Sequence, residues 1–127
     1  VEPNSLAAVT AMHVVEHLPY ADLIRLFGEA FRVLRPGGVI VFETPNPENV
    51  LVGSCSFWND PTHTRPLPPE ILLHLAEWRG FAGTEVMRLH PYEKWQHLPA
   101  EGDAALASRL NELFYGAQDY AVIARKP

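Results

Sequence analysis

Apolar residues along this chain follow two different spacings, and each spacing predicts one kind of element. Residues 5–15 form an apolar run with several β-branched side chains, which suits a strand buried on both faces, although a helix would also fit. Residues 39–44 form a second such run before a break at Pro45. Between them, residues 19–38 carry an apolar stripe at helical spacing that ends in a Pro-Gly-Gly stop. These lengths predict a βαβ unit with parallel strands and a right-handed crossover.

The rest of the pattern predicts two more helices and two more strands. Residues 45–69 are rich in proline and have little periodicity, which indicates a long loop just past the carboxyl end of the second strand. Beyond this loop we expect a helix over 68–80, a strand over 83–91, a helix over 103–115 and a closing strand over 118–127. The predicted fold class is therefore α/β, in one domain that occupies residues 1–127.

Composition and charge exclude several classes of function. The chain of 127 residues has 15 acidic and 10 basic side chains and no basic stripe, so we do not expect it to bind nucleic acid. No apolar run is long enough to span a bilayer, and the first residues do not form a signal peptide. A single cysteine, Cys55, cannot form an internal disulfide, which fits a cytoplasmic location. The missing initiator methionine indicates a piece of a longer protein.

His13, Glu16 and His17 form an H-x-x-E-H motif, which is the inverted signature of zinc peptidases. A zinc peptidase needs both histidines on a stable helix, where they face one metal. Here a predicted strand precedes the motif and Pro19 follows it, so a peptidase is disfavoured. The motif lies instead at the carboxyl end of a strand, where open α/β sheets bind their ligands. The long loop starts at the neighbouring strand end and brings His63 to the same rim.

These side chains are suited to more than one role. His17 suits a general base because histidine side chains ordinarily titrate near neutral pH; capping the following helix is the alternative. Glu16 can orient His17 or accept hydrogen bonds from loop amides. His63 completes a polar cluster with His13, Glu16 and His17 at this rim, and binding a ligand is one role for this cluster. A plain network of hydrogen bonds is the alternative for these four residues.

Two stretches, VTAMHVVEHLPY and LIRLFGEAFRVLRPGGVIVFETPNPEN, resemble the second half of class I S-adenosylmethionine-dependent methyltransferases. The resemblance covers nearly the whole chain and implies a partial Rossmann-like sheet with flanking helices. In the numbering of that fold the strands would be the fourth to the seventh, ordered 4-5-7-6, with the seventh antiparallel. The resemblance also implies S-adenosylmethionine as the cofactor, faced by Met12, His13 and Val14. It implies catalytic roles for the following side chains: His17, Glu16 and His63.

Two narrower resemblances concern the acceptor and the metal. The stretches FWNDPTHTRPLPPEILLHLAEWRGF and YGAQDYAVIARKP are similar to a bacterial subgroup that acts in polysaccharide or lipopolysaccharide assembly. That similarity implies methyl transfer to an oxygen or nitrogen of a saccharide-type acceptor. A different subgroup, the small-RNA 3′-terminal 2′-O-methyltransferases, holds a divalent metal with an E-x-x-E-H motif and a distant histidine. The layout of His13, Glu16, His17 and His63 resembles that motif, with histidine in place of the first glutamate. The resemblance implies that these four residues form a candidate site for a divalent metal, since imidazoles and a carboxylate can bind zinc, manganese or iron.

One departure from the methyltransferase family is large. Such enzymes hold their cofactor through a glycine-rich loop after the first strand and an acidic residue after the second, and this chain has neither. We therefore expect residues 1–127 to be the carboxyl-terminal half of the enzyme, inactive and without useful cofactor affinity alone. Two other functions remain open: a non-catalytic scaffold that kept this half-fold, and a metal-dependent hydrolase built on the four candidate metal ligands.

The first strand also predicts self-association. In the whole methyltransferase fold, the strand around residues 7–14 would pair on its far side with a strand that this chain lacks. Between Leu6 and Met12 it carries no charge and no proline, so its free edge is a template for another chain. We expect a two-fold dimer through this edge or the surface beside it.

Overall fold

The computed structural model describes all 127 residues and contains one four-stranded sheet. The strands lie in the order β1-β2-β4-β3, and their bounds are β1 Leu6–Met12, β2 Leu34–Pro45, β3 Ala82–Pro91 and β4 Ala117–Arg125. β1 and β2 are parallel, whereas β4 runs antiparallel to both of its neighbours. The predicted α/β class, the βαβ unit and the antiparallel closing strand are therefore confirmed, and the order of the four strands agrees with the predicted one.

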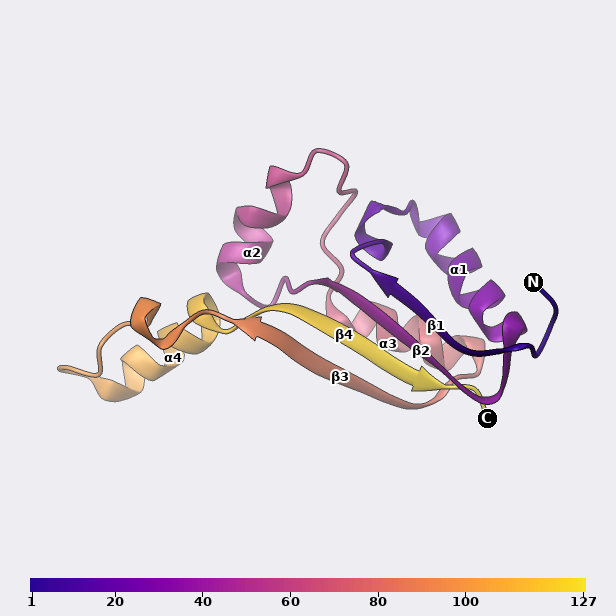
Figure 1. Ribbon diagram of the computed structural model, residues 1–127. Coiled ribbons are helices and arrows are strands. Elements are labelled where there is room, and N and C mark those ends of the chain that lie inside the picture. The colour runs from indigo at the N-terminus through magenta and orange to yellow at the C-terminus, as the bar shows by residue number, and fades with distance from the viewer.

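Four helices and three short 3₁₀ turns connect the strands. Their bounds are α1 Tyr20–Val33, α2 Val50–Ser54, α3 Pro69–Arg79, α4 Ala104–Tyr115, η1 Val15–His17, η2 Ser56–Asn59 and η3 Lys94–Gln96. Figure 1 shows α1, α2 and α3 on one side of the sheet, with α4 beyond the left-hand end of the β3–β4 pair. None of these helices is both long enough and apolar enough to cross a membrane.

Three sequence-based expectations need correction. The first strand ends at Met12, not near Val15, because His13 adopts a left-handed conformation (φ 52°) and the next residues turn into η1. That strand is also mostly exposed, since it lies at the edge of the sheet. The long loop holds α2 and η2, and α2 forms because the Asn49 side chain accepts hydrogen bonds from the amides of Leu51 and Val52.

The hydrophobic core lies between the sheet and helices α1 and α3 on one of its faces. Along β2 the side chains alternate, with Ile40, Phe42 and Thr44 buried and the residues between them half-exposed. Phe42 packs edge-to-face against Phe27 of α1, with ring centroids 5.1 Å apart. Leu72, Leu75 and Ala76 of α3 complete this layer. The alternation shows that helices cover only one face of the sheet.

The opposite face of the sheet carries no helix, as Figure 1 shows. Cross-strand pairing aligns Thr10, Val41 and Ile123 in one row across three strands. Thr10 is exposed, and Val41 and Ile123 are only half-buried. In the next row Met12 and Met87 are also exposed. Glu85 and Glu43 lie in the same two rows, so this uncovered face combines apolar side chains with carboxylates.

Buried polar contacts fix the long loop above the sheet. The Tyr120 hydroxyl donates a hydrogen bond to the Leu67 carbonyl at 2.6 Å, and burial raises the pKa of Tyr120, so the phenol stays protonated. Asn46 and Asn49 are also buried and donate to the carbonyls of Ala117 and Gly116, respectively. These contacts tie both ends of the loop to β4 and set where its central residues lie.

Candidate functional site

η1 and the loop after η2 meet beyond the carboxyl end of β1. The backbone N–H and the hydroxyl of Thr64 both donate to the Glu16 carbonyl, each at 2.8 Å. This double contact brings the rings of His17 and His63 within 4.7 Å of each other, edge to face. Two segments that lie about 45 residues apart in sequence thus form one cluster, as expected for the ligand-binding rim of an open α/β sheet.

Hydrogen bonds determine which nitrogen of His17 carries its proton. The Thr62 hydroxyl lies 2.9 Å from His17 Nδ1 and donates its single proton to Asp60 Oδ1 at 2.6 Å. The hydroxyl must therefore accept from Nδ1–H, which leaves Nε2 of a neutral His17 with a free electron pair. Hydrogen bonds from the hydroxyl and the backbone N–H of Thr62 hold the pKa of Asp60 below its usual range, so Asp60 stays charged and keeps this orientation.

The ring of His63 is oriented in the same way by a different partner. Its Nδ1 lies 2.6 Å from the backbone carbonyl of Phe57, and a carbonyl can only accept, so Nδ1 carries the proton. Nε2 of His63 is then free as an acceptor, 3.7 Å from Asp60 Oδ2. Phe57 is buried and lies 4.4 Å from the His63 ring between centroids, so it pins this part of the loop to the core.

Glu16 is fully buried beneath the two histidines. Its Oε2 accepts a hydrogen bond from the Thr44 hydroxyl at 3.0 Å, whereas its Oε1 has no hydrogen-bond partner. The nearest basic side chain that the structure records is His13, whose Nδ1 lies 3.3 Å from Oε1. A buried carboxylate oxygen without a partner is costly, so this atom indicates a place where a proton or a cation interacts.

The four residues of the predicted metal site do not form one cluster. A ligand atom from each of Glu16, His17 and His63 lies within 4.8 Å of the others. His13 turns instead toward the end of the sheet, where its Nε2 lies 3.3 Å from Glu43 Oε1 and 3.8 Å from Asp119 Oδ1. His13 also keeps a contact with Glu16, because its Nδ1 lies 3.3 Å from Glu16 Oε1, so a metal site that holds all four residues stays a prediction.

The three residues predicted on the cofactor side lie at the exposed end of the edge strand. Met12 is 50% exposed and Val14 is 43% exposed, and the backbone N–H of His13 donates to the Glu43 carbonyl at 3.0 Å. Exposed apolar side chains at the end of a strand offer a surface that a ligand or a further part of the protein can cover. They lie beside the His17 cluster, in the short connection between the end of β1 and the start of η1.

A small cavity opens between the two clusters. It has a volume of about 150 Å³, and His63 and Asp119 both contribute to its lining, together with Pro45, Val52, Ser56, Phe57 and Gln118. Binding sites for small molecules are commonly larger, about 300–1,000 Å³, so this cavity is one part of a site. Trp58 stands nearby on η2 with 54% of its surface exposed, its indole N–H bonded to the Gly53 carbonyl.

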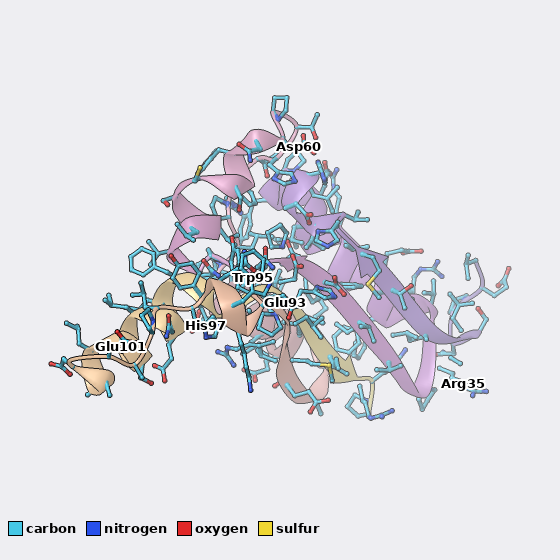
Figure 2. The ribbon with its side chains drawn as sticks, turned by 60° about the vertical axis from the view of Figure 1, so that its left-hand side comes forward. Arg35, Asp60, Glu93, Trp95, His97 and Glu101 are labelled. Atoms are coloured by element: carbon cyan, nitrogen blue, oxygen red, sulfur yellow. The ribbon has the colours of Figure 1, made fainter.

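Sequence reasoning missed the residues that orient the histidines. Thr62 was not a candidate. The sequence does carry a signal for its position, because an aspartate side chain commonly accepts a hydrogen bond from the backbone N–H two residues later, as Asp60 does from Thr62. Thr44 and Asp119 were missed as well. They come from β2 and β4, and only the pairing of these strands brings them to the rim. Figure 2 shows Asp60 at the tip of its loop, far from Arg35.

Comparisons with known proteins identify the fold and its family. A family model described as a methyltransferase domain matches residues 2–86. A Mycolicibacterium smegmatis protein named "Probable S-adenosylmethionine-dependent methyltransferase" is 42% identical over 77 residues, which are 61% of this chain and 29% of that protein. The chain thus spans less than a third of this curated relative.

Solved structures share the same architecture. A SAM-dependent methyltransferase from Archaeoglobus fulgidus superposes with a TM-score of 0.89 at 29% identity, over 99% of this chain and 62% of that one. Phosphoethanolamine N-methyltransferase 2 from Haemonchus contortus, solved with S-adenosyl-L-methionine, superposes with a TM-score of 0.65 at 19% identity. This match covers 99% of this chain and 34% of that one. The second likeness shows the fold alone. With the family model matching most of its length, the chain belongs to the methyltransferase domain family.

Proposed function

We propose that the protein to which these residues belong transfers a methyl group from S-adenosylmethionine to an oxygen or nitrogen of a saccharide-type acceptor. Membership of the methyltransferase domain family and the curated relative support the reaction class. Because the chain spans only part of its relatives, we propose that it supplies the acceptor side of the site. The cytoplasmic location expected from the single cysteine is part of this proposal.

The residues present fit one side of the cofactor. Met12 and Val14 expose apolar surface at the end of the strand, and no charged side chain lies between residues 6 and 12. Met12, His13 and Val14 would hold this side, whereas the turn after β1 has no glycine that would let a backbone approach closely. When bound, S-adenosylmethionine supplies an electrophilic methyl group on its sulfonium.

The free electron pair on His17 Nε2 is the observation that carries the proposal. Thr62 and Asp60 fix the tautomer that exposes this nitrogen at the rim of the sheet. An acceptor hydroxyl must lose its proton as it becomes methylated, and a neutral imidazole takes that proton well near neutral pH. Thr62 and Asp60 then stabilise the ring as it becomes positively charged, since both present oxygen atoms to its Nδ1 side.

The surroundings of His17 support a polar acceptor with flat apolar faces. Ser56, Gln118 and Asp119 supply donors and acceptors to the adjoining cavity. Trp58 offers an exposed aromatic surface nearby, and aromatic rings pack well on the carbon faces of sugars while leaving the hydroxyls free. These features support the saccharide acceptor that the DPTH stretch suggests.

Label transfer tests the proposed reaction. The whole protein, incubated with tritium-labelled S-adenosylmethionine and cell-envelope glycan precursors, should place the label in the carbohydrate fraction and release S-adenosylhomocysteine. Label that appears only in lipid, protein or RNA would disprove the saccharide acceptor but keep the methyltransferase. A whole protein that binds the cofactor and methylates none of these fractions would favour the scaffold alternative.

We further propose that the 127-residue chain associates with itself through the edge of β1. This strand pairs only with β2, and Ala7, Ala8 and Thr10 are exposed along it. Unpaired backbone groups beside uncharged side chains favour pairing with a second copy. We expect sedimentation at micromolar concentration to give a dimer or larger species.

A matched substitution makes the test of self-association specific. Thr10→Lys places a charge on the exposed side of β1 and should return the chain to a monomer without unfolding it. The proposal is wrong if the unmodified chain sediments as a monomer while the amides of residues 7–12 exchange slowly, because that result means the edge is already covered within one chain.

A further inference from the structure

The segment between β3 and β4, residues 92–116, forms an arm that carries η3 and α4 beyond the end of the sheet (Figure 1). None of the residues of α4 is buried, so this helix does not contribute to the core. Polar contacts hold it in place instead. Asp103 caps its first turn, and the Asn111 amide exchanges two hydrogen bonds, of 2.8 and 3.1 Å, with the backbone of Leu98.

A cavity of about 400 Å³ lies between α4 and the segment that follows η3, and we call it the apolar cavity. This volume is within the range of about 300–1,000 Å³ that is common for small-molecule sites. Its polar lining offers few free groups, because the amide of Asn111 is already used by Leu98. The apolar part of the lining consists of Pro91, Leu98, Ala100, Ala104, Ala107 and Tyr115.

His97 places an unpaired polar atom in the wall of the apolar cavity. Its Nε2 is buried and has no hydrogen-bond partner. Its ring lies beside that of Tyr115, with 6.1 Å between the centroids. Native proteins leave few buried polar groups unpaired, so this nitrogen indicates a contact that the chain alone does not supply. An apolar cavity with a few such polar groups is the usual composition of a small-molecule site.

A second cavity, which we call the polar cavity, has a volume of about 500 Å³ and shares Glu112 and Gly116 with the first. Its charged side chains form two ion pairs. Arg88 donates two hydrogen bonds of 2.9 Å to Glu48, and Arg109 donates one of 3.1 Å to Glu112. Because these charges balance, a charged ligand gains little net attraction here. A molecule with several hydroxyls suits the polar cavity better, since each hydroxyl both donates and accepts.

The polar cavity lies next to the cavity beside His63. Asn46 and Ala117 line the polar cavity, and their neighbours in the chain, Pro45 and Gln118, line the cavity beside His63. The Asn46 N–H donates to the Gln118 carbonyl at 2.8 Å, which fixes the two segments at this point. The three cavities therefore follow one another from the candidate site to the arm.

We propose that the acceptor is a glycoside with an apolar aglycone, whose sugar part occupies the polar cavity and whose aglycone occupies the apolar cavity of the arm. The order of the cavities sets the order of the parts, with the reacting hydroxyl near His17 and the apolar end under α4. This inference rests on the proposed function, because the saccharide acceptor is part of it. It adds a class of acceptor that the surroundings of His17 do not specify.

Two glucosides that differ only in their aglycone test the apolar cavity. Calorimetry with the whole protein, below the critical micelle concentration, should show that octyl β-D-glucoside binds about 100-fold more tightly than methyl β-D-glucoside. Each methylene that leaves water strengthens binding by about fourfold, so burial of half of the octyl chain is sufficient. Ala107→Phe fills the cavity and should remove most of this preference, with no change in the affinity for methyl β-D-glucoside.

Matched variants show whether the two cavities act as proposed. Ala105→Phe adds the same ring to an exposed residue of α4 outside the cavity lining and should keep the preference for the octyl glucoside. Arg88→Met should weaken the binding of both glucosides by about 10-fold, because it removes hydrogen-bond donors from the polar cavity. Arg25→Met breaks another exposed ion pair, with Asp22 on α1, and should change neither affinity.

Equal affinities for the two glucosides would overturn the proposal. Equal losses in Ala105→Phe and Ala107→Phe, both folded by circular dichroism, would overturn it as well. Because the binding experiment needs neither cofactor nor methyl transfer, it is separate from the test of the proposed function. A protein that prefers the octyl glucoside but methylates no saccharide would keep the glycoside site and disprove the proposed function. A protein that methylates saccharides but binds both glucosides equally would do the opposite.

Discussion

In the whole protein, replacing His17 by alanine should lower kcat by about 10²–10⁴-fold and leave the affinity for S-adenosylhomocysteine unchanged. The loss is expected because Nε2 of His17 carries a free electron pair. Thr62 and Asp60 hold the ring of His17 in place at the rim of β1. The cofactor should still bind because, in the proposed arrangement, the backbone around Met12 and Val14 faces it. Turnover is to be measured at saturating acceptor, with a chelator present so that a bound ion does not confuse the result.

A second substitution distinguishes a base from a structural residue. Thr62→Val keeps the imidazole but removes the acceptor for its Nδ1–H, so kcat should fall less than in His17→Ala, by about 10-fold, and the pH profile should shift. His74→Ala, on the exposed side of α3, should behave like the unmodified protein. Full turnover by His17→Ala would show that this residue only supports η1 locally.

Replacing Phe42 by alanine should reduce the free energy of unfolding of the 127-residue chain by about 3–5 kcal/mol. Phe42 lies in the middle of β2, is fully buried, and packs edge-to-face against Phe27. Only 26 of the 127 residues are buried, and a typical domain has a total stability of about 5–15 kcal/mol. The substitution should therefore remove a large share of the stability of the chain, and urea denaturation followed by circular dichroism should show a much lower midpoint.

Trp95→Ala is the matched control for Phe42→Ala, because it also removes an aromatic ring. Trp95 is 82% exposed on η3, and Figure 2 shows it on the arm that also carries Glu93 and His97. Its loss should change the free energy of unfolding by no more than about 0.5 kcal/mol. Equal effects of the two substitutions would contradict the placement of the core between the sheet and α1.

The sequence was sufficient to predict the elements whose periodicity is strong. The stripe that includes Leu23 and Phe27 predicts α1, and the short β-branched run after the Pro-Gly-Gly stop predicts β2. Parallel pairing follows from the length of the connection between them. The order of the four strands came from the family resemblance, since no spacing in the chain decides which side of β2 the last strand joins.

The details of the site were harder to predict, because they depend on single backbone angles and on contacts between distant segments. The left-handed conformation of His13 (φ 52°) is rare for a residue with a side chain, and no pattern in the sequence indicates it. It lets the ring of His13 lie between Glu16, Glu43 and Asp119, outside the group that Glu16 forms with His17 and His63. The contact of Thr62 with His17 joins residues 45 positions apart, which periodicity cannot reveal.

Calorimetry with S-adenosylhomocysteine tests the central claim, that this chain is the acceptor side of a methyltransferase whose cofactor is held mainly by other parts of the protein. The whole protein should bind the product with micromolar affinity, and the 127-residue chain should bind at least about 100-fold more weakly, a difference of about 2.7 kcal/mol. Equal affinity of the chain alone and the whole protein would contradict this division of the site, and no binding by the whole protein would contradict methyl transfer itself.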